Sequence, residues 1–169
     1  SLACGHSEEA VEAVIEYINA HPDEEVVYIT DCHPENHSSF VEFGGIWPPH
    51  CIEGTRGGAI HESFYTKVEN PANRPDPNRN IFRKGCKQDE EQYSGFEAVN
   101  TNGVALKDYA NKDVVVSGIA TEYCVRNTAE EFLKSGRNVE LLLSGLGYVD
   151  YEGHKTTIKE LREKMTIVE

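Results

Sequence analysis

The feature that most constrains this chain is the alternation of strand-like and helix-like segments in its second half. Residues 113–118 (DVVVSG) and 139–143 (VELLL) are short apolar runs, which are typical of buried strands. Residues 122–135 lie between them and carry apolar side chains on one helical face, and residues 152–165 form a further helical segment. This alternation predicts an α/β domain with a mostly parallel sheet and helices on both faces.

The first half of the chain adds one more helix and one more strand. Residues 7–20 have apolar side chains at the spacing of an amphipathic helix, with Ser7 as the expected N-cap. Residues 25–30 (EVVYIT) are interpreted as a buried strand, and residues 166–169 (TIVE) as a final edge strand. Residues 31–57 are rich in Pro, Gly, His and Asn, which predicts a long functional loop.

Charge and cysteine content restrict the partners and the setting of the protein. The chain has 29 acidic and 16 basic residues, which gives a net charge of −13 at pH 7. Such a surface repels phosphate backbones and anionic lipids, so we expect no nucleic-acid or membrane partner. The cysteines are widely spread and form no CxxC pair, which predicts unpaired thiols in a reducing, cytoplasmic setting. They are Cys4, Cys32, Cys51, Cys86 and Cys124.

The loop at residues 31–57 begins with a group of side chains that can bind a metal. Asp31 and His33 are two residues apart at the carboxyl end of the expected strand, so both side chains leave the same face. In open α/β sheets, ligands bind outside this end of the strands. With His37 and His50 in the same loop, the set suits a divalent transition metal such as zinc, iron or manganese. Loop histidines are also commonly solvated bystanders, so composition alone leaves the metal open.

Cys124 occurs where the chain passes from the strand at 113–118 into a helix. Thr121 is the expected N-cap, which places Cys124 in the first helical turn, where backbone N–H groups and the helix dipole lower the pKa of a thiol. A lysine that projected toward the thiol, such as Lys84, would lower that pKa further. Free cysteine is also among the most buried residue types, and a lysine before a glycine is usually a solvated loop residue. Both side chains therefore have ordinary structural interpretations as well.

Five short motifs stand in a recognisable order along nearly the whole chain: TDCHPENHSSF, WPPHC…GT, RKG, YSGF and GIATEYCVRNTA. Together they resemble the nicotinamidase/pyrazinamidase branch of the isochorismatase-like cysteine hydrolases. The resemblance implies a largely parallel sheet of about six strands flanked by helices on both faces. It also implies a metal-dependent cysteine amidase that hydrolyses nicotinamide to nicotinate and ammonia, with pyrazinamide-like amides as further substrates.

The resemblance assigns catalytic roles. Cys124 would attack the carboxamide carbon and form a thioester, and Lys84 would hold the thiolate and polarise the site. The peptide between Ile119 and Ala120 would be cis, and it would aim the Ala120 N–H, with that of Cys124, at the oxyanion.

The same resemblance assigns the metal and substrate contacts. One divalent metal, zinc first and iron or manganese as alternatives, would be held by Asp31, His33 and His50. His37 matches a position that is a ligand only in some members of the family. The aromatic amide would lie between Trp47 and Tyr93, beside Ile119.

One family feature is absent from the sequence. The family has a first strand ending in an Asp-x-Gln-Asn-Asp-Phe-like motif, whose leading aspartate is the general acid/base. No such motif occurs here, and SLACGHSEEAVEAV resembles the segment just after it. We therefore expect residues 1–169 to be a single, N-terminally incomplete domain with unpaired strand edges where a central strand would lie.

Two other functions stay open on the sequence alone. The chain would be a non-catalytic metal- or ligand-binding pseudoenzyme if it lacked the acid/base, whose loss costs about 10²–10⁴-fold in rate. It would be a related hydrolase if it acted on another small amide. An aspartate within hydrogen-bonding reach of Cys124 distinguishes an amidase from a pseudoenzyme. The sequence does not determine the oligomeric state, and a homo-oligomer is compatible with it.

Overall fold

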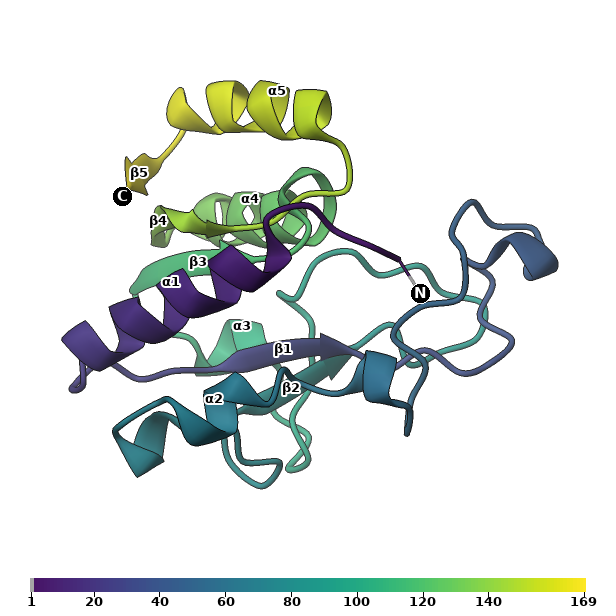
Figure 1. Ribbon diagram of the computed structural model, residues 1–169, viewed down its shortest axis with the longest axis horizontal. Helices are drawn as coiled ribbons and strands as arrows, with labels where there is room; N and C mark the ends of the chain where they lie inside the picture. The colour runs from purple at the N-terminus through teal and green to yellow at the C-terminus, as the bar shows by residue number, and fades with distance from the viewer. Residues whose placement is uncertain (1) are drawn as a thin grey trace.

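The computed structural model describes residues 2–169 and shows an α/β fold (Figure 1). Its helices within this range are α1 (Ser7–Ala20), α2 (Ser63–Thr66), α3 (Leu106–Tyr109), α4 (Arg126–Lys134) and α5 (Tyr151–Arg162). Its strands are β1 (Tyr28–Asp31), β2 (Ile81–Lys84), β3 (Asp113–Gly118), β4 (Asn138–Leu146) and β5 (Thr166–Val168). A π-helical turn, η4 (Thr121–Val125), leads into α4, and three 3₁₀ turns are η1 (Val41–Phe43), η2 (Arg56–Gly58) and η3 (Pro71–Asn73). In the described part of the chain, no helix is long and apolar enough to cross a membrane.

All strand pairs are parallel, and they form two separate sheets. β1 pairs with β2, while β4 lies between β3 and β5 in the other sheet. The predicted α/β class with parallel strands is confirmed. The predicted sheet of about six strands included a first strand that the sequence lacks; within residues 2–169 the strands form sheets of two and three strands, and no strand connects β1 with β3.

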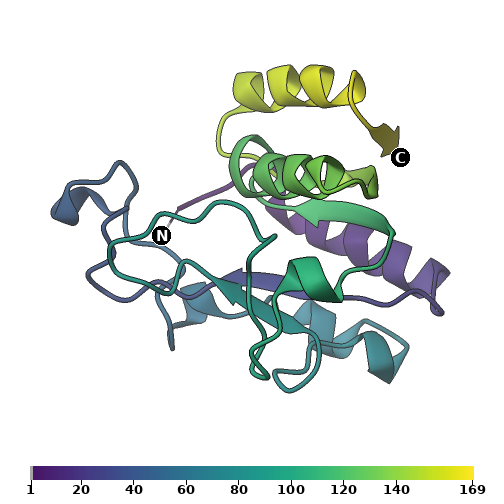
Figure 2. The ribbon, with the colours of Figure 1, turned by 180° about the vertical axis from the view of Figure 1, so that it is seen from behind.

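Helices cover both faces of the strands. α1 lies in front of the three-stranded sheet in Figure 1 and behind it in Figure 2, whereas α4 lies on the opposite side. Ile15 and Ile18 of α1 form a small buried cluster with Val68. The main core lies on the other face, where Phe132 of α4 and Leu161 of α5 belong to one buried cluster with Leu141 of β4. This packing holds the strand ends in place beneath the functional loops.

Several predicted boundaries are confirmed and others shift. The helix predicted over residues 7–20 matches α1, but His6 precedes the helix in a left-handed conformation and Ser7 is its first residue, so Ser7 is not the N-cap. The strand predicted over 25–30 starts later, as β1, because its length is set by pairing with β2. The strand β2 is not predicted from the sequence, because its short apolar segment has no periodicity of its own.

The helix predicted over residues 122–135 begins with the π-helical turn η4. Thr121 does not cap it, because its hydroxyl donates a hydrogen bond of 2.8 Å to the Gly147 carbonyl and contributes no side-chain cap. This buried hydroxyl ties the start of the helix to the loop after β4. Gly136, with φ of 85°, ends the helix as predicted, since glycine adopts this conformation without a Cβ clash.

The cysteines also differ from the prediction. A disulfide joins Cys32 to Cys86 across a sequence separation of 54 residues, while Cys4, Cys51 and Cys124 are free. The prediction of unpaired thiols is therefore wrong for two of the five cysteines. The reason is the parallel pairing of β1 with β2, which brings the residues after each strand together and leaves no mark in the cysteine spacing.

Candidate active site

The predicted catalytic and metal-binding residues meet at the carboxyl ends of β1, β2 and β3. Asp31 ends β1 and lies opposite Lys84, the last residue of β2, in the parallel register. Cys124 lies in η4, just beyond β3. The Lys84 Nζ donates to Asp31 Oδ1 at 2.5 Å and to Cys124 Sγ at 3.5 Å. Lys84 therefore bridges the predicted nucleophile and a predicted metal ligand.

The ammonium of Lys84 is buried and fully bonded. Its side chain is 4% exposed, and its third hydrogen bond goes to the Gln92 carbonyl at 2.9 Å. Burial acts to lower the pKa of Lys84, but the neighbouring Cys124 and Asp31 raise it more, so the net direction is upward. Lys84 is thus a fixed positive charge. Gln92, whose amide oxygen also accepts from the Gly85 N–H at 2.9 Å, was missed because it lies in a polar loop without a motif.

The pKa of the Cys124 thiol differs from the prediction. Burial of the thiol raises its pKa, and the negative charge of Asp31 adds to this. Lys84 and a hydrogen bond from the Ala120 backbone act in the opposite direction without reversing the shift. The predicted lowering of the pKa is therefore wrong for this arrangement, because desolvation of a thiolate outweighs the nearby positive charge.

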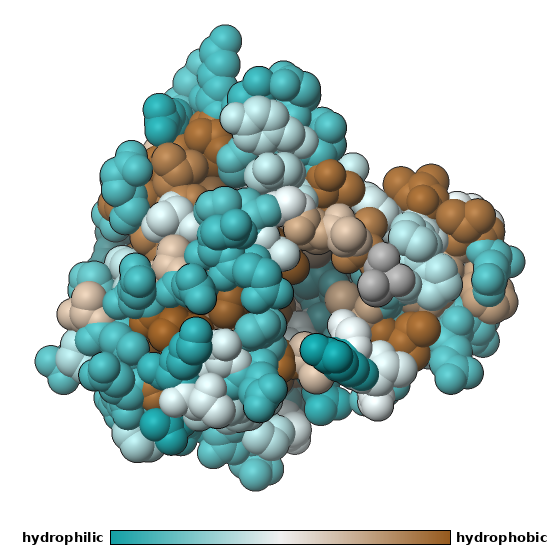
Figure 3. Space-filling view, in the orientation of Figure 1, coloured by the Kyte–Doolittle hydropathy of each residue, from teal (hydrophilic) through white to brown (hydrophobic). Residues whose placement is uncertain are grey.

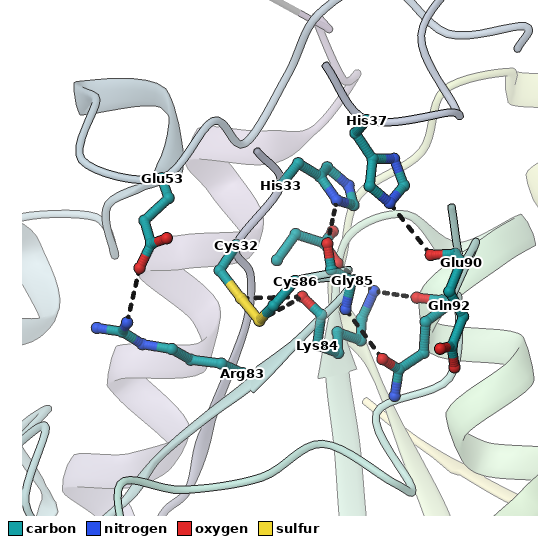
Figure 4. The surroundings of a disulfide bond; sticks show 11 residues. Cys32, His33, His37, Glu53, Arg83, Lys84, Gly85, Cys86, Glu90 and Gln92 are labelled. Atoms are coloured by element: carbon teal, nitrogen blue, oxygen red, sulfur yellow. Dashed lines mark hydrogen bonds and ion pairs between the residues drawn. A yellow bond between two sulfur atoms is a disulfide. The ribbon is translucent and has the colours of Figure 1, made fainter. Parts of the chain in front are cut away.

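Two of the predicted metal-binding histidines are oriented by hydrogen bonds to backbone carbonyls. The Nδ1 of His33 donates to the Gly85 carbonyl at 2.8 Å, and the Nδ1 of His50 donates to the Pro48 carbonyl at 2.8 Å. Figure 4 shows the His33 ring turned toward Gly85. This arrangement leaves Nε2 of each ring for a metal, in the way that ligating histidines are usually held.

The donor chemistry of the site fits a divalent transition metal. The ring centroids of His33 and His50 are 5.1 Å apart. Two imidazoles on one tetrahedral zinc, with bonds of about 2.0–2.1 Å, have centroids about 5 Å apart. Lys84 donates to Oδ1 of Asp31, so Oδ2 of this carboxylate is not bonded to Lys84. Within residues 2–169, no three His, Cys, Asp or Glu side chains lie close enough together to form a complete metal-binding group. The site therefore has suitable donor types but not a preformed coordination sphere.

His37 has a different environment from the other two histidines. Its Nδ1 lies 2.7 Å from the Ser39 hydroxyl and its Nε2 lies 3.1 Å from the Glu90 carbonyl, so both ring nitrogens have protein partners. The ring is fully buried and packs against His33 with centroids 4.1 Å apart. This geometry favours a supporting role behind His33 over ligation.

Replacement of His37 by glutamine is expected to leave the stoichiometry of added divalent metal unchanged, whereas His50→Ala is expected to lose metal binding. Loss of the two hydrogen bonds of His37 is expected to lower the free energy of unfolding by about 1–3 kcal/mol. Zinc content after dialysis, measured by elemental mass spectrometry, and urea unfolding check both variants. A folded His37→Gln protein without zinc would show that His37 is a ligand.

Aromatic rings border the site on the side of the long loop. The indole Nε1 of Trp47 donates to the Tyr93 hydroxyl at 3.0 Å, which locks these two predicted substrate contacts together. The Tyr123 ring meets Trp47 edge to face with centroids 4.8 Å apart, and it lies 5.5 Å from Tyr93. Tyr123 is not among the predicted site residues, although its position beside Cys124 is a signal for it. Ile119, the residue that follows β3, is 49% exposed.

The loop that carries Trp47 projects from the body of the protein (Figure 1). Figure 3 shows apolar side chains gathered on it, and the exposed large residues there are Val41, Phe43 and Ile46. Trp47 of the same loop is buried.

The sequence profile of the isochorismatase domain matches residues 2–169. The chain belongs to this family. A nicotinamidase/pyrazinamidase of Mycobacterium tuberculosis is 31% identical over 170 residues, covering 96% of this chain and 86% of that protein. The crystal structure of the pyrazinamidase of Pyrococcus horikoshii in complex with zinc matches with a TM-score of 0.78 and 34% identity, covering 96% of this chain and 86% of that one. The structure of PnC1 from L. infantum in complex with nicotinate matches with a TM-score of 0.71 and 33% identity, covering 94% and 80%.

Two details of this isochorismatase-family site concern the reaction. The Ile119–Ala120 peptide is cis, as the resemblance implied. Among residues 2–169, Lys84 is the charged side chain hydrogen-bonded to the Cys124 sulfur, and Asp31 reaches that sulfur only through Lys84. The described residues thus hold the predicted nucleophile and its lysine but show no carboxylate bonded directly to the thiol.

Proposed function

We propose that this chain is a metal-dependent cysteine amidase that hydrolyses nicotinamide to nicotinate and ammonia, with pyrazinamide-like amides as further substrates. The observation that carries the proposal is the 3.5 Å contact between Cys124 Sγ and Lys84 Nζ, next to the metal donors of Asp31 and His33. Relatives at 31% and 34% identity are a nicotinamidase/pyrazinamidase and a zinc-containing pyrazinamidase. Their names agree with the chemistry of this site.

The reaction divides into two acyl-transfer steps. The Cys124 thiol loses its proton as the sulfur attacks the carboxamide carbon, and that proton passes to the departing nitrogen when the C–N bond breaks, so ammonia leaves and a thioester forms. Water then attacks the thioester carbonyl, which releases nicotinate and the free thiol. Lys84 stabilises the thiolate in the first step, and the Ala120 N–H is placed beside the sulfur to donate to the oxyanion.

The substrate is oriented by aromatic side chains of the long loop, of the segment after β2 and of η4. The rings of Trp47, Tyr93 and Tyr123 offer apolar and edge contacts to a single aromatic ring. Asp31, His33 and His50 would hold a divalent metal, zinc first and iron or manganese as alternatives, with His37 supporting His33. When bound, the metal supplies positive charge that attracts the ring nitrogen of a pyridine or pyrazine carboxamide.

Ammonia release from nicotinamide, pyrazinamide and benzamide by the zinc-loaded protein tests the proposal. We expect turnover of the two heterocyclic amides and at least about tenfold slower release from benzamide, which lacks the ring nitrogen and thus one interaction of about 1.4 kcal/mol. Absence of ammonia from all three amides would overturn the proposal.

One observation favours a second candidate, a non-catalytic ligand-binding protein. Within the described residues no carboxylate is hydrogen-bonded to the Cys124 sulfur, so the site shows no general acid/base at the position where the reaction needs a proton. Calorimetry together with the ammonia assay separates the two candidates. A binding protein would take up nicotinamide with a measurable heat and release no ammonia, whereas an amidase would release it.

A further inference from the structure

The Cys32–Cys86 disulfide borders the candidate active site and has no part in the proposed reaction. Cys32 lies between Asp31 and His33, and Cys86 is two residues beyond Lys84. The disulfide therefore cross-links the chain immediately after β1 to the chain immediately after β2 (Figure 4). Each linked segment carries residues that the proposed reaction uses.

The two cysteine residues differ in their exposure to solvent. Cys32 is 5% exposed, whereas Cys86 is exposed on the loop that follows β2. Thiol–disulfide exchange requires a thiolate to reach one sulfur of the bond, and exposed disulfides are the labile ones. An external thiolate would thus attack Cys86, with Cys32 as the leaving group.

The residue between Lys84 and Cys86 links the disulfide to the site. The Gly85 carbonyl accepts from His33 Nδ1, and its N–H donates to Gln92. Gly85 has a φ of 62°, and a methyl group placed on it would lie 2.6 Å from the Cε1 of His33, so the two residues are in close contact. The position of Gly85 therefore sets the orientation of the His33 ring.

Both cysteine sulfurs contact the same backbone group beside the site. The Lys84 carbonyl lies 3.4 Å from Cys32 Sγ and 3.6 Å from Cys86 Sγ, and it also accepts from the Cys32 N–H at 2.9 Å. The disulfide thus restrains the peptide that carries Lys84 and leads into Gly85. Reduction of the disulfide would remove this restraint on the Lys84–Gly85 peptide at its Cys86 end.

We propose that Cys32–Cys86 is a reversible redox modification site whose oxidised state holds Gly85, and through it His33, in the metal-binding orientation. The co-reactant is a dithiol. One dithiol thiolate forms a mixed disulfide with Cys86 and expels the Cys32 thiolate; the second then closes the reductant's own disulfide and releases Cys86. Two electrons pass to the protein, and the dithiol is oxidised. The exchange does not depend on the proposed amidase function, whereas any effect on ammonia release does.

Equilibration of the protein in graded mixtures of oxidised and reduced dithiothreitol tests the site itself. After acid quenching, alkylation with iodoacetamide and peptide mass spectrometry report each cysteine. We expect Cys32 and Cys86 to become alkylated together as the mixture becomes reducing, and to become protected together when it is made oxidising again. Protection that never forms, or alkylation that never appears in folded protein, would overturn the proposal.

Zinc affinity tests the link to the metal-binding residues without reference to activity. The dithiol is removed anaerobically, because it binds zinc, and the oxidised and reduced proteins are titrated with zinc alone. We expect the dissociation constant to rise about tenfold on reduction, the lower end of the effect of disturbing a group that orients a metal ligand. Equal affinities in the two states would overturn the role of the disulfide in holding His33.

The Cys86→Ser variant is the matched control, because it removes an exposed sulfur and leaves Cys32 in place. We expect it to bind zinc like the reduced wild-type protein and to be insensitive to the dithiol mixture. A variant that matches the oxidised wild type would contradict the proposal. Reversible exchange with a change in zinc affinity but no ammonia release would support this site and overturn the amidase function.

Discussion

The Cys124→Ala protein is expected to release ammonia from nicotinamide more than about 10⁴-fold more slowly than the wild-type protein. The substitution removes the atom that forms the thioester and leaves Lys84 without one of its three hydrogen-bond partners. Lys84 keeps Asp31 and the Gln92 carbonyl, so the charge network around it persists. The loss should therefore be in turnover, with nicotinamide binding retained.

Coupled measurement of ammonia and calorimetric binding of nicotinamide check this expectation. Cys4→Ala is a suitable control, because Cys4 is also a free cysteine but has no place in the Lys84 network. Acid quenching of the wild-type protein during turnover should also trap the acyl group on the peptide that contains Cys124. Ammonia release by Cys124→Ala at a rate close to that of the Cys4→Ala control would exclude Cys124 as the nucleophile.

The Lys84→Met protein is expected to lose both stability and activity. Removal of the buried ammonium leaves the carboxylate of Asp31 without its ion-pair partner, which should lower the free energy of unfolding by about 3–5 kcal/mol. The thiolate of Cys124 also loses the positive charge that stabilises it, so we expect ammonia release to fall by about 10²–10³-fold. Urea unfolding and the ammonia assay measure the two effects separately.

Lys87→Met is the matched control for this substitution. Lys87 lies three residues farther along, its side chain is 80% exposed, and its ion pair is with Glu90 on the surface. We expect little change in stability or activity there, because solvent screens exposed pairs. If Lys84→Met were as stable and as active as Lys87→Met, the buried network would have neither the structural nor the catalytic role assigned to it.

The sequence determined the local elements and the chemistry of the motifs. The apolar periodicity over residues 7–20 matches α1, and the β-branched run at 113–118 matches β3, because both patterns depend on neighbours within one turn or one strand. The two-residue spacing of Asp31 and His33 at a strand end likewise predicted two metal donors on one face. The motif order was specific enough to identify the family.

Only the tertiary structure decided how these parts meet, because that depends on strand register and burial over long sequence separations. The register of β1 with β2 places Asp31 against Lys84 and joins Cys32 to Cys86, and nothing local to either segment encodes it. Burial raises the pKa of Cys124 against the effect of its lysine. The sequence therefore predicted which groups react, whereas packing decided their partners and the direction of their pKa shifts, because desolvation and cross-strand contacts exist only once the chain has folded.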